Sequence, residues 1–147
     1  MIPEIISITV FTLYIVAIVI IFGILKSVSD SYYHIKHKIF FTLALWGFAV
    51  PAMIAGGTVL MFLAGSAICF VGATPAFKMK HEGIVHYIGA VSGIILGMAS
   101  MWLDFGLWWI VAIMAVGFVI LRWKATNYTY WIELLAFYLI LLGLIIS

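Results

Sequence analysis

The stretch from residue 39 to residue 77 constrains the fold most, because it contains no Asp, Glu, Lys or Arg. As one helix it would be roughly 58 Å long at about 1.5 Å per residue, whereas about 20 apolar residues suffice to cross a bilayer. Pro51 and the Gly56-Gly57 pair mark a break, since proline removes a backbone donor and glycine relaxes the backbone. We therefore predict a tight helical hairpin, which either crosses the membrane or re-enters on the same side.

The rest of the chain is similarly apolar, with 67% hydrophobic and 8% charged residues among its 147. Lipid offers no water to unpaired backbone groups, so helices and closed barrels are the structures that span a bilayer. The apolar runs here are continuous and do not alternate, which excludes a barrel. We predict a single domain over residues 1–147. It is an all-α, polytopic transmembrane helix bundle with six spans, at residues 5–25, 39–55, 57–77, 84–103, 105–121 and 127–146.

The positions of the basic residues predict an orientation. They follow the first, third and fifth spans, and they are Lys26, Lys36, Lys38, Lys78, Lys80, Arg122 and Lys124. Six crossings place them all on one side, which the positive-inside rule makes cytoplasmic, and both termini are then non-cytoplasmic. We expect these side chains to contact lipid headgroups. A net charge of +2 spread over so few charges does not indicate nucleic-acid binding, so membrane lipids are the expected partners.

The fourth predicted span contains a ridge of small residues. Gly89, Gly93 and Gly97 recur every four residues, which predicts a face where another helix packs closely. That helix belongs either to the same bundle or to a second copy in a homo-oligomer. His86 lies on the same face, so we expect it to point toward the neighbouring helix and count it as a functional candidate.

A few polar residues predict a cluster on the cytoplasmic side. Glu133 is a carboxylate well inside the last span, about 9 Å along the helix axis from Asn127. His86 enters the fourth span at a compatible depth, and pairing is how a membrane accommodates such groups. With Ser29 and Asp30 from the first basic loop, these residues form the predicted polar cluster. A neutral His86 bonded to a backbone carbonyl or a tyrosine is the competing, purely structural interpretation.

The first basic loop also carries residues that can ligate metals. On a helical extension, Asp30 and His34 are four residues apart and His37 follows three residues later, so the three would share a face. Such spacing can bind zinc, with His34, His37 and His86 as ligands. No HExxH or comparable signature is present, and a solvated basic loop is the competing interpretation. We expect no cofactor, with zinc as the alternative.

Three segments carry a family resemblance: SVSDSYYHIKHKIFF, VHYIGA and WIELLAFY. In order and spacing they resemble the six-helix membrane proteins of the DRAM, Frag and Sfk type and related uncharacterised prokaryotic six-span families. The resemblance implies a regulatory or lipid-related role without established catalytic chemistry. On that analogy the family-like positions are Ser29, Asp30, His86, Gly89 and Glu133. That family is expected to keep its N-terminus in the cytosol, whereas the lysines here place the first loop inside.

These observations favour a non-enzymatic integral membrane protein whose polar cluster binds a lipid headgroup or serves regulation. One alternative is a membrane-embedded, metal-dependent hydrolase similar to the ceramidase-like superfamily. In that case a metal would lower the pKa of a bound water to about 7. Another alternative is a small proton-coupled transporter or channel subunit, in which Glu133 and His86 relay protons and the interruption from Pro51 to Gly57 is a broken-helix site.

Overall fold

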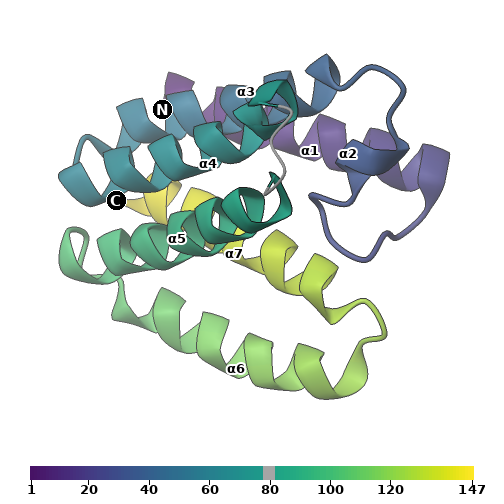
Figure 1. Ribbon diagram of the computed structural model, residues 1–147. Coiled ribbons are helices and arrows are strands. Elements are labelled where there is room, and N and C mark those ends of the chain that lie inside the picture. The colour runs from purple at the N-terminus through teal and green to yellow at the C-terminus, as the bar shows by residue number, and fades with distance from the viewer. Residues whose placement is uncertain (78–81) are drawn as a thin grey trace.

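Within the described residues, six long helices run back and forth along the molecule (Figure 1). The computed structural model describes residues 1–77 and 82–147, and within them the chain is all-α, as predicted. Its helices are α1 (Ile2–Phe22), α2 (Ser31–His34), α3 (Ile39–Gly56), α4 (Val59–Phe77), α5 (Glu82–Leu103), α6 (Trp108–Lys124) and α7 (Tyr128–Ile146). The predicted basic contacts Lys78 and Lys80 lie outside the described residues, as does His81.

The two ends of the bundle differ in what they contain. Both termini lie at one end with the α3–α4 and α5–α6 turns, and α2 lies at the other end with the α6–α7 loop (Figure 1). We call this second end the basic end. The loops and helix ends there carry the described basic residues, which are Lys26, Lys36, Lys38, Arg122 and Lys124.

Four of the helices are long and apolar enough to span a membrane. They are α1, α3, α7 and the part of α5 from Gly83 to Leu103. The described apolar part of α4 is shorter, at Val59–Ala73, and α6 has 17 residues with Arg122 and Lys124 in its last turn. Each of the six predicted segments is therefore helical, and four of them have the length and composition of a membrane span.

Glycines move two helix boundaries away from the predicted ones. The first span was expected at residues 5–25, but α1 begins at Ile2, with Pro3 in its first turn, and ends at Phe22. Gly23 follows with φ 76°, a left-handed value that glycine adopts without steric cost and that turns the chain out of the helix. The fifth span was expected at 105–121. Gly106 has φ 70°, and α6 begins only at Trp108 and continues to Lys124.

The predicted hairpin is confirmed, but only one of its two expected breaks interrupts the helix. Gly57 ends α3 in the left-handed conformation, with φ 60°, and its amide donates to the Met53 carbonyl. Pro51 lies inside α3 without ending it. A proline removes one donor, which packed neighbouring helices tolerate, whereas the reversal of direction requires a positive φ. Across the hairpin, Thr42 Oγ1 donates to the Gly72 carbonyl at 2.7 Å.

The glycine ridge of α5 packs inside the chain, as its spacing predicts. A Cβ built at Gly89 would lie 2.8 Å from Val71 Cγ2 of α4. Gly97 faces α7 at Ile140 as well as Ala64 of α4. These close approaches hold three helices together by backbone proximity. Because α4 and α7 cover the ridge, a second copy could reach it only by displacing α4.

A side chain added to the ridge should separate α4 from α5. A Cβ at Gly93 would lie 2.6 Å from Ile68 Cδ1 and 3.3 Å from the Ala64 carbonyl oxygen. We expect Gly93→Ala to lower the free energy of unfolding by about 1 to 3 kcal/mol, the usual cost of overpacking. Gly83→Ala is the matched control on the same helix, because no atom of the described residues lies within 4 Å of its Cβ. Unfolding in mixed micelles measures both. Equal stability of the two variants would contradict this packing.

Candidate functional site

The loop from Gly23 to Asp30, which we call the α1–α2 loop, folds against the first turns of α7. Its Val28 amide donates to Glu133 Oε2 at 2.7 Å, and the Ser29 amide also hydrogen-bonds to this carboxylate. Irregular backbone near lipid needs partners inside the protein, because each unsatisfied amide costs several kcal/mol there. Glu133 therefore supplies a partly buried acceptor that holds a non-helical segment in place.

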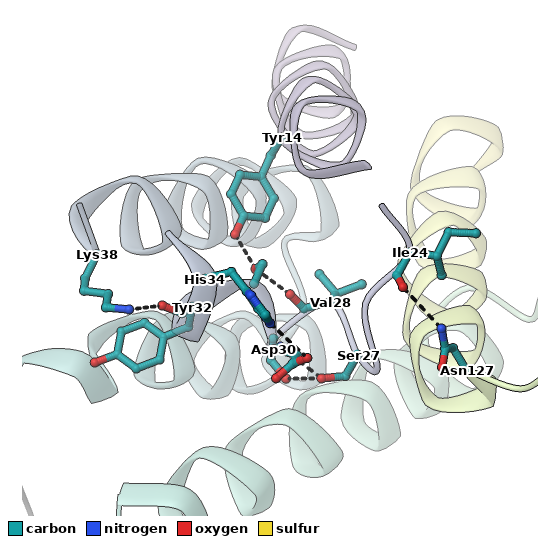
Figure 2. A network of polar contacts seen from close by, with 11 residues as sticks. Tyr14, Ile24, Ser27, Val28, Asp30, Tyr32, His34, Lys38 and Asn127 are labelled. Carbon is teal, nitrogen blue, oxygen red and sulfur yellow. Dashed lines mark hydrogen bonds and ion pairs between the residues drawn. The ribbon is translucent and has the colours of Figure 1, made fainter. Parts of the chain in front are cut away.

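Two further bonds fasten the same loop to α7. Asn127 Nδ2 donates to the Ile24 carbonyl at 3.2 Å (Figure 2). The Tyr130 amide, in the first turn of α7, donates to the Lys26 carbonyl at 3.1 Å. The first amides of a helix lack intrahelical partners, so a tertiary carbonyl satisfies one of them here. The path of the loop is thus determined by α7 along most of its length.

The other side of the loop is held by a buried serine. Ser31 is fully buried, and its hydroxyl donates to the Val28 carbonyl at 2.6 Å. The same hydroxyl hydrogen-bonds to the Tyr14 hydroxyl of α1 at 2.5 Å (Figure 2). The Asp30 amide donates to Ser27 Oγ at 3.0 Å, a local turn typical of serine. Val28 is therefore held through both its amide and its carbonyl.

Of the three residues predicted to share a helical face, Asp30 and His34 do so, whereas the expected place of His37 on that face is wrong because α2 ends at His34. Asp30 precedes the short helix α2, and its Oδ2 lies 3.6 Å from His34 Nε2 (Figure 2). His37 lies beyond the end of α2, against the Phe40 ring. Lys38 is one of the predicted headgroup contacts. Its Nζ donates to the Tyr32 backbone carbonyl and lies 4.4 Å from the centre of the Tyr32 ring.

The three histidines of the zinc hypothesis lie against three different aromatic rings. His34 packs on Phe22 with 5.8 Å between ring centres, His37 on Phe40 at 6.3 Å and His86 on Phe41 at 6.2 Å. Within residues 1–77 and 82–147, no group of three or more His, Cys, Asp or Glu side chains is placed to hold a metal ion.

A large cavity lies at the basic end, between the α1–α2 loop, α5, α6 and α7. We call it the chamber; its volume is about 460 Å³. Its polar lining residues are Ser27, Ser29, Tyr87, Arg122, Tyr128, Thr129 and Glu133. The Arg122 guanidinium lies 4.5 Å from the centre of the Tyr128 ring, a cation–π contact that positions it at the wall. The chamber thus places a cation and a carboxylate on different helices around one space.

The structure brings together part of the predicted polar cluster. Ser29 and Glu133 line the chamber side by side, and Asp30, which pairs with His34, lies close enough to Glu133 for the two carboxylates to interact electrostatically. His86 stacks on Phe41. Arg122 was expected at a lipid headgroup, and it lines the same space. Sequence reasoning missed the ring that supports Arg122, because Tyr128 belongs to the aromatic residues near span ends that are ordinary in membrane proteins.

No family model, curated protein or solved structure matches this chain. The resemblance to the DRAM, Frag and Sfk type therefore stays a prediction, and the function is argued from the geometry of the chamber.

Proposed function

We propose that this protein is a non-enzymatic, multi-pass membrane protein that binds a phospholipid headgroup in the chamber. The observation that supports the proposal is a cavity of about 460 Å³ that opens among Arg122, serine hydroxyls and Glu133 at the basic end. Its volume lies within the range of ligand sites, roughly 300 to 1,000 Å³. The proposal extends the predicted lipid-binding role from a cluster of residues to a defined space.

The orientation follows from charge. In the proposal all six long helices cross the membrane, and the basic end faces the cytoplasm because of the positive-inside rule. Four helices with the length and composition of spans support the crossings, and the alternation of ends in Figure 1 supports the count of six. The headgroup then comes from the cytoplasmic leaflet, whose anionic lipids attract basic residues.

Arg122 is the residue expected to hold the phosphate. A guanidinium presents a planar set of donors that matches two phosphate oxygens at once, and its charge persists at any physiological pH. Stacking on Tyr128 restricts its rotation before any ligand arrives, so little side-chain entropy is lost on binding. Its place in the last turn of α6 puts it at the depth of lipid phosphates in the proposed orientation.

Removing the Arg122 charge should weaken phospholipid binding. Ligand that binds only the folded state adds stability, about 2.7 kcal/mol at a hundredfold excess over Kd. We therefore expect phosphatidylglycerol to raise the Tm of delipidated protein, with an apparent affinity about tenfold weaker in Arg122→Gln. Lys124→Gln is the matched control, since Lys124 lies on the same helix end but outside the chamber. An equal loss of apparent affinity in Arg122→Gln and Lys124→Gln would mean that the lipid responds only to surface charge, and it would overturn the proposal.

The orientation is tested by single cysteines in a Cys69→Ser background. We expect a membrane-impermeant maleimide added to intact cells to label Ser147→Cys and to leave Lys36→Cys unlabelled until the membrane is opened. The reverse pattern would place the basic end, and the chamber with it, on the non-cytoplasmic side.

A further inference from the structure

An apolar groove adjoins the chamber. This groove, between α5 and α6, measures about 410 Å³ and shares Ile94 and Phe118 with the chamber lining. Its remaining walls are apolar side chains of the two helices, among them Met98, Trp102 and Met114. A ligand with a polar head in the chamber can therefore place an apolar chain in the groove without crossing a polar wall.

Two other apolar pockets offer no place for the chain of the same ligand. One, which shares Ser29, Ala90, Ile94 and Glu133 with the chamber lining, has a volume of about 20 Å³ and is too small for an acyl chain. A second groove, about 430 Å³, lies between α6 and α7 along Ala112, Val116 and Leu135. It has no lining residue in common with the chamber. The space thus has the shape of one polar head and one chain.

The charged groups of the chamber lie at different depths. Arg122 is two residues before the end of α6, about 3 Å along the axis, and Glu133 is five residues after the start of α7, about 7.5 Å. The helix ends are adjacent, joined by residues 125–127. Counted along the two helices, the Cα of Glu133 is therefore about 4 to 5 Å farther from the α6–α7 loop than the Cα of Arg122, toward the residues that line the groove.

We propose, resting on the proposed function, that the occupant is a single-chain glycerophospholipid. Its phosphate binds Arg122, its free glycerol hydroxyl donates to Glu133, and its acyl chain lies in the α5–α6 groove. A lysophospholipid carries these three groups in this order. Its phosphate, its free hydroxyl and its acyl chain are attached to successive carbons of the glycerol, so the hydroxyl lies between the phosphate and the chain. Arg122 thus matches the phosphate near the basic end, and Glu133 matches the hydroxyl donor farther into the bundle.

The free glycerol hydroxyl distinguishes this ligand from an ordinary diacyl phospholipid. In a diacyl lipid the corresponding oxygen is esterified and has no hydrogen to donate. It would face the Glu133 carboxylate as a second acceptor, and an acceptor that loses water without gaining a donor costs about 1 to 3 kcal/mol in general. A site that hydrogen-bonds a hydroxyl rejects analogues that lack it more strongly than a site that only accommodates an apolar group.

The test is photo-crosslinking in nanodiscs of phosphatidylcholine. The probe is lysophosphatidic acid with a diazirine in its acyl chain, competed by unlabelled lysophosphatidic acid, by its 2-deoxy analogue, or by phosphatidic acid. We expect crosslinks on α5 and α6 peptides that contain Met98, Trp102 or Met114. Unlabelled lysophosphatidic acid should compete at a concentration at least about tenfold lower than the 2-deoxy analogue and phosphatidic acid.

A pair of variants tests the groove separately from the head. Ala115→Phe should fill the α5–α6 groove and reduce crosslinking about tenfold, whereas Ala112→Phe should leave it unchanged because Ala112 lines the other groove. Equal competition by all three lipids, with binding still dependent on Arg122, would overturn the single-chain inference and leave the proposed function intact. Crosslinking that does not depend on Arg122 would overturn the proposed function itself.

Discussion

Glu133→Ala should lower the free energy of unfolding by about 3 kcal/mol, because it removes the acceptor that holds the α1–α2 loop on α7. The Val28 amide donates to Glu133 Oε2 at 2.7 Å, and the Ser29 amide bonds to the same carboxylate, so the substitution removes the acceptor of two backbone amides near lipid. Hydrogen bonds to charged groups contribute about 1.5 to 3 kcal/mol, and an orphaned donor adds its desolvation cost. Reversible unfolding in mixed micelles measures the difference.

Two matched variants separate the hydrogen bond from the charge. Glu133→Gln keeps a carbonyl oxygen that can accept from Val28, so we expect a loss of about 1 kcal/mol. Glu4→Ala removes another glutamate, whose carboxylate pairs with the exposed N-terminal amine at 2.7 Å and holds no loop in place, and should change stability less than Glu133→Ala. Equal destabilisation by Glu133→Gln and Glu133→Ala would show that the charge, and not the acceptor, holds the loop.

Phe11→Ala should destabilise the bundle by about 3 kcal/mol or more. Phe11 is 0% exposed, and its ring centre lies 5.1 Å from those of Phe48 and Phe137 and 5.6 Å from that of Tyr138. Truncating a buried phenylalanine leaves a cavity that costs about 3 to 5 kcal/mol in soluble proteins. Part of that cost in soluble proteins is the free energy of transferring the side chain from water into the core. Helices that stay in lipid when they separate do not have this contribution, so we expect the lower end of the range here.

Leu13→Ala is the control for the aromatic cluster. Leu13 lies two residues away on the same helix and is 65% exposed, so its side chain contacts lipid in the proposed orientation. We expect a change of less than about 1 kcal/mol. Unfolding of the two variants under identical micelle conditions compares them. A loss with Leu13→Ala as large as that with Phe11→Ala would mean that the exposed face of α1 packs on another protein surface.

The helices were predictable because a membrane imposes strong requirements on sequence. An uncharged run longer than one crossing, with Gly56 and Gly57 near its middle, predicts a hairpin, and the structure turns there. The repeat of Gly89, Gly93 and Gly97 predicts a packed face, and α4 and α7 cover it. Both signals are local: each follows from residues adjacent in sequence or on one helix face.

The chamber was not predictable in the same way, because it depends on the path of irregular backbone. Gly23 ends α1 three residues before the expected boundary, and this frees the loop that reaches α7. We predicted His86 as a cationic partner for Glu133, and that pairing stays a prediction, but the partner that the structure adds is the Val28 backbone amide. Apolar periodicity contains no information on backbone amides as partners, so the pairing of a loop with a buried carboxylate appears only in three dimensions.

Native mass spectrometry of the protein released from lipid nanodiscs tests the central claim most directly. The account predicts one retained phospholipid per wild-type chain, the same adduct in Lys124→Gln, and its loss in Arg122→Gln. Retention of the same lipid by Arg122→Gln, or the absence of any phospholipid from folded wild-type protein, would contradict a headgroup site in the chamber.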